Sequence, residues 1–175
     1  MTIERNSPMS KTPYARPSTA VVVTGAAGGI GRAVSLRLGG DGFVVVCVDI
    51  DEDSVREVIA SIEATGGRAV GVTGDVSLES TAVAVVDEIA SLGVELTGLV
   101  NNAGVGVFGV RMEELDLEDW NRVIGVNLTS VFLLAKHTIP LLRESGGAIV
   151  NVSSIHAYAS STGVTPYAAS KGGVL

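Results

Sequence analysis

Three kinds of residue are scarce in this sequence, and each scarcity excludes a class of protein. Cys47 is the one cysteine, so an internal disulfide cannot form and a reducing cytoplasmic setting is expected. Aromatic residues make up only 4% of the 175 residues, and 12 Lys and Arg stand against 19 Asp and Glu. Because nucleic-acid binding needs clustered basic side chains, the net charge of −7 predicts no nucleic-acid partner.

Long apolar runs are also missing. None approaches the roughly 20 residues that span a bilayer, so no membrane partner is expected. Residues 1–18 are polar and lack the apolar segment of a signal peptide, which predicts a disordered tail before one domain over residues 19–175. His137 and His156 have no metal-ligand spacing with another His, Cys or carboxylate, so no metal site is predicted.

Val, Ala and Gly are abundant instead, and short apolar runs alternate with helical segments. Strands are expected at 20–24, 43–50, 69–73 and 148–153, and residues 98–101 are expected to end a fourth strand between the last two. Helices are expected at 29–38, 52–65, 78–92, 117–142 and 167–175, with Asp51, Ser77 and Asp116 as N-caps and Gly39-Gly40 and Gly66-Gly67 as stops. This alternation predicts an α/β fold with a doubly wound parallel sheet, whose ligands bind at the carboxyl ends of the strands.

The segment between the first strand and the first helix is rich in glycine: Thr24-Gly25-Ala26-Ala27-Gly28-Gly29-Ile30-Gly31. Small residues let the backbone approach a ligand closely, and the free N–H groups of the following helix attract phosphate oxygens. The absence of Gly-Lys-Ser/Thr excludes a Walker-type loop. We predict that this loop holds the pyrophosphate of a dinucleotide, with contacts from Gly25, Gly28, Gly29, Ile30 and Gly31.

An acidic residue ends the second strand. Asp49 follows Gly25 by 24 residues, a spacing at which a carboxylate accepts hydrogen bonds from the adenosine ribose, with Ile50 beside it. The same carboxylate repels a 2′-phosphate, so NAD is favoured over NADP. The alternative is that Asp49 only begins a loop, and Arg32 is a weak argument for NADP.

Several motifs together resemble one family. They are the loop at 24–31, Asp75-Val76, Asn101-Asn102-Ala103-Gly104, Asn127, Ser154 and Tyr167-Ala168-Ala169-Ser170-Lys171. In this order and spacing the chain resembles a short-chain dehydrogenase/reductase from Ala20 onward. The resemblance implies a Rossmann-type sheet with strand order 3-2-1-4-5, a small alcohol or ketone substrate, and a homo-oligomer for the complete enzyme.

The resemblance also implies residue roles. Tyr167 would be the general acid/base, and the positive charge of Lys171, one helical turn away, favours its phenolate form. Ser154 would hold the substrate oxygen; the neighbouring Ser153 is the competing candidate, but the 13-residue spacing to Tyr167 selects Ser154. Asn127 would anchor a proton-relaying water. The expected cofactor contacts are Asp75, Val76, Asn102, Ala103, Gly104, Tyr167 and Lys171.

The chain ends four residues after Lys171, so we expect the domain to be incomplete at its C-terminus relative to the family. Three hypotheses stay open. The leading one is an NAD-dependent oxidoreductase that interconverts a secondary alcohol and a ketone. The second is a non-catalytic nucleotide-binding module. The third is an epimerase or dehydratase that uses the same Tyr/Lys pair; the loop does not exclude it, because Gly25, Gly28 and Gly31 also satisfy the T-G-x-x-G-x-x-G spacing.

Overall fold

The computed structural model describes residues 18–175, so the tail expected over the preceding residues lies outside the described part of the chain, except for Ser18. Five strands form one parallel sheet in the order β3-β2-β1-β4-β5. They are β1 (Thr19–Thr24), β2 (Val44–Asp49), β3 (Arg68–Thr73), β4 (Glu95–Asn101) and β5 (Ala148–Asn151). The predicted Rossmann-type fold and strand order are therefore confirmed.

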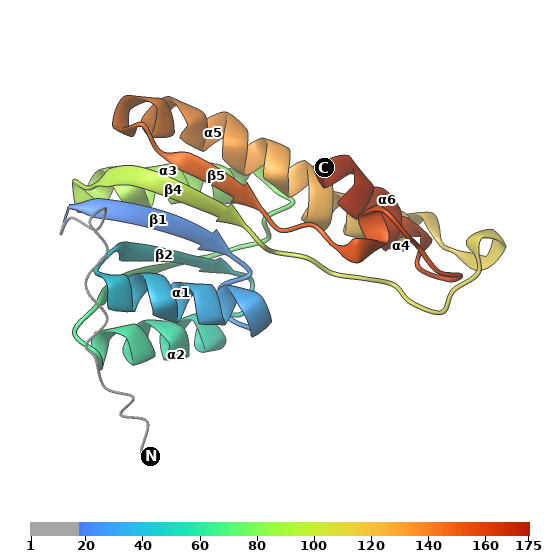
Figure 1. The fold of residues 1–175 in the computed structure, drawn as a ribbon, viewed down its shortest axis with the longest axis horizontal. Coiled ribbons are helices and arrows are strands. Elements are labelled where there is room, and N and C mark those ends of the chain that lie inside the picture. Colours follow the sequence, from blue (N-terminus) through green and yellow to red (C-terminus); the bar gives the residue numbers. More distant parts are fainter. Residues whose placement is uncertain (1–17) are drawn as a thin grey trace, which may run out of the picture.

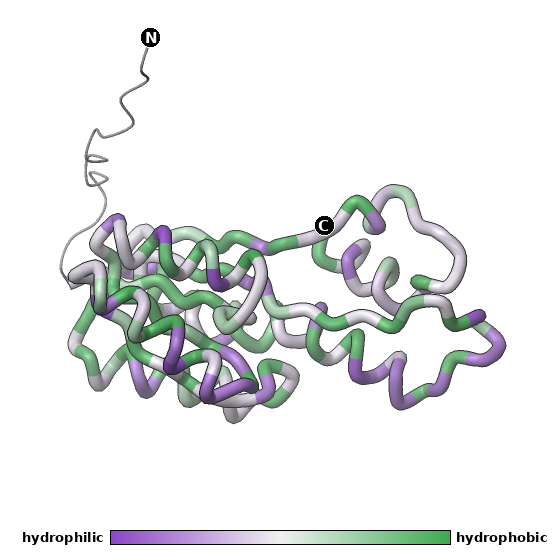
Figure 2. The backbone as a smooth tube through the Cα atoms, turned by 90° about the horizontal axis from the view of Figure 1, so that it is seen from below, coloured by the Kyte–Doolittle hydropathy of each residue, from purple (hydrophilic) through white to green (hydrophobic). Residues whose placement is uncertain are grey.

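Within the described residues, six α-helices and three short turns connect or follow these strands. The helices are α1 (Gly29–Asp41), α2 (Glu52–Glu63), α3 (Glu79–Leu92), α4 (Leu117–Ile124), α5 (Ser130–Ser145) and α6 (Thr165–Val174). The turns are η1 (Met112–Glu114), the π-helical η2 (Gly125–Thr129) and η3 (Ile155–Ala157). In Figure 1 the strand arrows point toward the end of the molecule that carries α4 and α6. Seen from below in Figure 2, these segments form the right-hand end, beyond the sheet.

Two apolar clusters, one on each face of the sheet, form the core. On one face, alternate side chains of β1 and β2, such as Val22 and Val46, pack against α3 and α5. On the other, Val45 and Cys47 pack against α1 and α2. Because each strand presents both faces to helices, β1 and β2 read as continuous apolar runs. Burial raises the pKa of the Cys47 thiol to about 11, which suits the core role expected for this residue.

The end of α1 corrects one sequence prediction. Gly39 and Gly40 do not stop the helix, which continues to Asp41 and ends at Gly42, whose φ is +98°. Gly39 serves packing instead, since a Cβ there would lie 2.5 Å from Cγ2 of Ile62 on α2. The positive φ of Gly42 is a conformation that glycine adopts without strain, so this residue provides the stop.

Other helix boundaries also differ from expectation. Ser77 does not cap α3: Leu78 takes the N-cap position, and the Ser77 N–H donates to Asp75 Oδ1 at 2.8 Å. Asp51 does cap α2, accepting from Ser54 N at 3.1 Å. Asp116 precedes α4 without a side-chain cap bond. The long helix expected after it is divided by the π-helical turn η2.

The helical stretch 117–145 modifies the expectation about membranes. Among the described residues it is the one stretch that is long and apolar enough to cross a bilayer, by length and composition alone. Its second half, α5, packs on β4 and α3, and Leu134 and Leu142 are buried there. The core helix of a soluble protein passes the same test. This stretch is therefore not assigned as a membrane-spanning helix.

Candidate cofactor and catalytic site

The glycine-rich loop leaves the N-terminus of α1 open. Gly28 is the N-cap and makes no side-chain cap bond, and the first turn of α1 has no acidic residue. A Cβ at Gly28 or Gly29 would meet nothing within 4 Å. The unpaired N–H groups and the positive end of the helix dipole therefore face open space, which suits an anionic group such as a pyrophosphate.

Hydrogen bonds and close contacts hold this loop rigidly on the sheet. Asn102 Nδ2 donates to the carbonyls of Thr24 and Gly25 at 3.0 and 3.3 Å. The buried Thr24 hydroxyl accepts from the N–H groups of Asn102 and Ala103, both at 3.0 Å. A Cβ at Gly31 would lie 1.9 Å from the Gly25 carbonyl oxygen, so this glycine lets the helix start pack against the loop itself. The structure thus joins the loop at 24–31 to the Asn101–Gly104 motif, through bonds between residues 77 to 79 positions apart.

Asp49 lies at the end of β2, beside the loop. Its Oδ2 accepts from Ala27 N at 2.9 Å, and its Oδ1 accepts from Ile50 N at 2.8 Å. The side chain is half-buried and lines two adjoining cavities. Asp49 therefore braces the glycine loop, a role that the sequence did not suggest, while its carboxylate borders the space where a ribose would lie.

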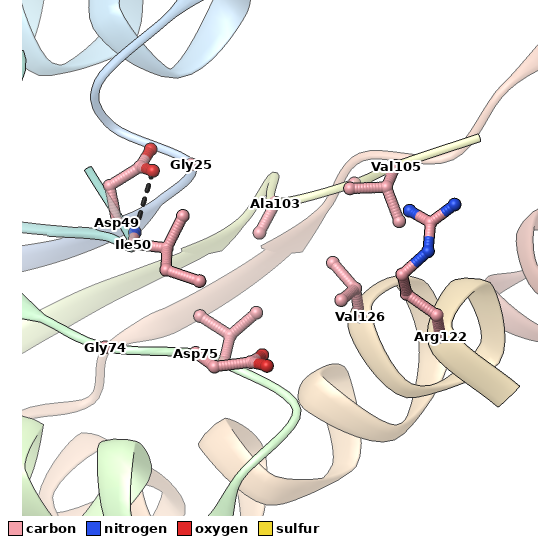
Figure 3. Close-up of a pocket in the computed structure, with 11 residues that line it drawn as sticks. Gly25, Asp49, Ile50, Gly74, Asp75, Ala103, Val105, Arg122 and Val126 are labelled. Carbon is pink, nitrogen blue, oxygen red and sulfur yellow. Dashed lines mark hydrogen bonds between the residues drawn. The ribbon is translucent and has the colours of Figure 1, made fainter. Parts of the chain in front are cut away.

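The two cavities share Gly25, Asp49, Ala103 and Gly104. One, of about 630 Å³, lies along Gly28, Gly29 and Ile30 at the start of α1. The other, of about 280 Å³, continues past Ile50 to Asp75 and Val76, and Figure 3 shows Asp49 and Arg122 at its opposite ends. All the expected loop and adenine-side residues except Gly31 line one or other cavity, and the pair can accommodate the adenosine diphosphate half of a dinucleotide.

Sequence reasoning missed several lining residues. They are Gly74, Val105, Arg122 and Val126 in the smaller cavity, and Ala27, Asp51 and Ser54 in the larger one. No local pattern singles out Arg122, which lies on α4 shortly before the π-helical turn. Figure 3 shows its guanidinium directed toward Val105.

Asn127 lies in η2 and is 1% exposed. Its Oδ1 accepts from Val105 N at 2.8 Å, and its Nδ2 donates to Val105 O at 2.9 Å and to Ser170 Oγ at 3.0 Å. The side chain therefore ties the loop after β4 to α6. Because both amide N–H groups are bonded to protein atoms, this side chain has no donor left for a proton-relaying water.

Tyr167 and Lys171 lie one turn apart on α6. Lys171 is 4% exposed, and its Nζ donates to Val152 O at 2.8 Å and lies 5.8 Å from the centre of the Tyr167 ring. Burial lowers the pKa of the Lys171 ammonium. Within residues 18–175 no ion pair with a carboxylate is recorded for this lysine, so its charge is available to a neighbouring phenolate.

The two serines after β5 have different environments. Ser153 Oγ donates to the Lys171 carbonyl at 2.8 Å and so anchors α6. Ser154 Oγ accepts only from His156 N, at 3.3 Å, which leaves its proton free to be donated. Both serines lie past Asn151, where β5 ends earlier than expected. Ser154 therefore has a free hydroxyl donor, and its role as the substrate-binding serine stays a prediction.

The two histidines also differ. His137 Nε2 lies 2.9 Å from Glu79 Oε1 on the surface, consistent with a structural role. His156 packs its ring edge against Tyr167, with ring centres 5.9 Å apart. In the part of the chain that the structure describes, no group of three or more His, Cys, Asp or Glu is arranged to hold a metal ion.

Comparisons with known proteins agree with this geometry. The sequence model of the short chain dehydrogenase family matches residues 19–175. A 3beta-hydroxysteroid dehydrogenase of Mediterraneibacter gnavus is 39% identical over 151 residues, covering 86% of this chain and 55% of that protein. A short-chain dehydrogenase/reductase from Burkholderia phymatum, solved in complex with NAD, is 31% identical with a TM-score of 0.85. This match covers 90% of this chain and 56% of the Burkholderia chain.

A second solved structure, a metagenomic short-chain oxidoreductase in complex with NADP, is 34% identical with a TM-score of 0.85. That match covers 90% of this chain and 72% of the metagenomic protein. The chain thus spans little more than half the length of the steroid dehydrogenase and of the NAD complex. Because the family match extends over all the strands and over the Tyr167–Lys171 turn, the chain belongs to the short-chain dehydrogenase family.

Proposed function

We propose that this chain carries the cofactor-binding and catalytic residues of an NAD-dependent oxidoreductase that interconverts a secondary alcohol and a ketone. The observation that carries the proposal is the buried Lys171 ammonium beside the Tyr167 ring, on the same helix. A buried cation without a carboxylate partner stabilises an anion nearby, and the phenolate of Tyr167 is the anion that general-base catalysis needs. The steroid dehydrogenase named above is a relative that acts on a secondary alcohol.

The protein residues divide the chemistry between them. In the oxidation direction, the Tyr167 phenolate takes the hydroxyl proton of the alcohol while Ser154 Oγ donates a hydrogen bond to the same oxygen. As the carbonyl forms, the electron pair of the carbon–hydrogen bond leaves with its hydrogen as hydride. The bound nicotinamide would supply the acceptor for that hydride, while the protein supplies position and electrostatics. In the reverse direction, the phenol of Tyr167 returns the proton.

The preference for NAD rests on Asp49. Its carboxylate borders both cavities, and no basic side chain lies among the residues that line the larger one. A 2′-phosphate placed there would meet a negative charge, whereas two ribose hydroxyls would meet hydrogen-bond acceptors. The only basic residue of the smaller cavity, Arg122, lies at the end away from Asp49 (Figure 3).

The test compares binding with turnover. The 175-residue chain is titrated with NADH and NADPH, and alcohol oxidation is assayed in parallel with the Tyr167→Phe variant. We expect NADH to bind more tightly than NADPH, and Tyr167→Phe to lower turnover by about 100-fold or more, a far larger effect than its effect on NADH binding. Asp49→Ala should weaken the preference for NADH, and the exposed Asp53→Ala on α2 serves as the matched control.

Two outcomes would contradict the proposal. Tighter NADPH binding by the unaltered chain would reverse the cofactor assignment. NADH binding without turnover would favour the non-catalytic nucleotide-binding module. The structural argument for that module is that both cavities lie on β1–β4, α1, α2 and the α4–η2 segment.

A further inference from the structure

The smaller cavity, of about 280 Å³, has few polar side chains in its wall. Glycine, alanine, valine and isoleucine form most of it, and the polar side chains among the described lining residues are those of Asp49, Asp75 and Arg122. The two carboxylates, when ionised, only accept hydrogen bonds. Arg122 therefore provides the one side-chain hydrogen-bond donor among these lining residues.

The position of Arg122 in this cavity relates it to the base of a nucleotide. Figure 3 shows Asp49 and Arg122 at opposite ends. A cavity of this volume is at the small end of the range for ligand sites, so a nucleoside would occupy much of its length. With the ribose at Asp49, as the proposed function has it, the base would extend toward Arg122.

The Arg122 guanidinium has donors to spare. Its Nη2 donates to Asp119 Oδ1 at 2.9 Å, which is the one hydrogen bond recorded for this guanidinium within residues 18–175. The side chain is 48% exposed, so a ligand in the cavity can reach it. A guanidinium carries five N–H donors, and most of them are therefore available to a ligand.

Asp75 supplies the complementary acceptor in the same cavity. Its Oδ1 accepts from Ser77 N at 2.8 Å, and no partner is recorded for its Oδ2 in the described part of the chain. Adenine carries an amine donor at C6, flanked by the acceptor nitrogens N1 and N7. A free carboxylate oxygen and a guanidinium on one cavity match such a neighbouring donor and acceptor.

We propose that Arg122 binds the adenine base of the cofactor, by donating a hydrogen bond to a ring nitrogen beside the 6-amine. The apolar lining residues, such as Ile50 and Val126, cover the faces of the base. This inference rests on the dinucleotide binding proposed above. It adds to that site a residue that the family resemblance did not imply.

The experiment measures the hydrogen bond through the base itself. NADH bound to the 175-residue chain is displaced with 5′-AMP, 1-deaza-AMP or 7-deaza-AMP, and each deaza analogue replaces one ring nitrogen by a C–H group. We expect one of the two analogues to bind about 5–10-fold more weakly than AMP, as the loss of one hydrogen bond implies. In Arg122→Met, AMP should be weakened by the same factor, and that analogue should then bind as well as AMP.

Three further variants separate this contact from a structural role of the Arg122–Asp119 ion pair. Asp119→Asn removes the recorded partner and keeps the guanidinium, so the penalty for the analogue should persist. Arg122→Lys keeps a donor and should retain part of it. Arg56→Met, on α2, loses a comparable surface pair with Asp53 and should behave as the wild type. If Arg122→Met fails to fold, the wild-type analogue series and Arg122→Lys still decide.

Three results would overturn the inference: AMP fails to displace NADH, both analogues bind the wild type as well as AMP, or the penalty persists undiminished in the Arg122 variants. Each of them can occur while NADH binds and turnover is lost in Tyr167→Phe, which would leave the proposed function standing. Failure of the proposed function would instead show as absent NADH binding or as turnover that is insensitive to Tyr167→Phe.

Discussion

The centre of the sheet and its β5 edge are supported very differently. All six residues of β1 are buried, and so are the first five of β2, between helices on both faces. All four residues of β5 are exposed, with Val150 55% exposed. The cofactor cavities lie mainly on the well-supported strands, whereas Ser154, Tyr167 and Lys171 follow the exposed edge.

Under the proposed function, cofactor binding and catalysis would therefore depend on different interactions. The glycine loop is held by a buried sheet and by hydrogen bonds from Asn102. The helix that carries Tyr167 is held by a few polar contacts, from Ser153 and Lys171 to backbone carbonyls and from Asn127 to Ser170. Perturbations at the β5 edge should therefore impair catalysis before they impair cofactor binding.

The largest expected effect separates the two parts of the sheet directly. Val22→Asp places an unpaired carboxylate in a fully buried position of β1 and should lower the free energy of unfolding by about 4 kcal/mol or more. Val150→Asp on β5 should change it by no more than about 0.5 kcal/mol. Urea unfolding of both variants measures this, and equal losses would refute the contrast.

A smaller effect is expected within α1. Gly31→Ala should destabilise the chain by about 1–3 kcal/mol and weaken NADH binding, because its Cβ would collide with the Gly25 carbonyl. Gly40→Ala, in the same helix but with open space at its Cβ, should raise stability by up to about 1 kcal/mol. Thermal unfolding and NADH titration of the pair test this, and a neutral Gly31→Ala would show that the loop is not rigid.

The smallest effect concerns the charge buried on the catalytic side. Because burial lowers the pKa of Lys171, the folded chain binds fewer protons than the unfolded chain between the lowered and the ordinary pKa. The free energy of unfolding should therefore rise with pH across that window. Lys171→Met removes this contribution, so the wild type should gain stability relative to the variant as the pH rises above neutral.

Urea unfolding of wild type and Lys171→Met over a series of pH values gives the difference, in which the titration of all other groups largely cancels. A difference that is flat with pH would mean that Lys171 is as well solvated in the folded chain as in the unfolded one.

Local signals sufficed to predict the five strands and the helix that Asp51 caps. The order of the strands in the sheet was implied by the family resemblance. They failed where a distant contact decides. Gly39 reads as a stop, yet it allows α1 to approach Ile62 of α2. Ser77 reads as a cap, but its N–H is bound by Asp75, and Leu78 takes the cap position.

The same limit applies to the site. The order of the motifs identified the residues around the cofactor cavities, because parallel strands bring their carboxyl ends together. No local pattern could show that Asp49 accepts the Ala27 N–H or that Asn127 is paired with Val105 and Ser170. These bonds join residues 22 and 43 positions apart, and the tertiary fold alone creates them.

The π-helical turn η2 has a consequence for how this chain tolerates changes in length. Bonded i→i+5, its five residues advance the helix by about as much as four α-helical residues, so deleting one of them and restoring α-helical bonding would leave α4 and α5 nearly in phase. Restoring α-helical bonding with all five residues kept would instead rotate α4 by about 100° about its axis relative to α5 and carry Arg122 away from the cavity. The π-helical bonding of this turn therefore sets the angular phase between the two halves of the site.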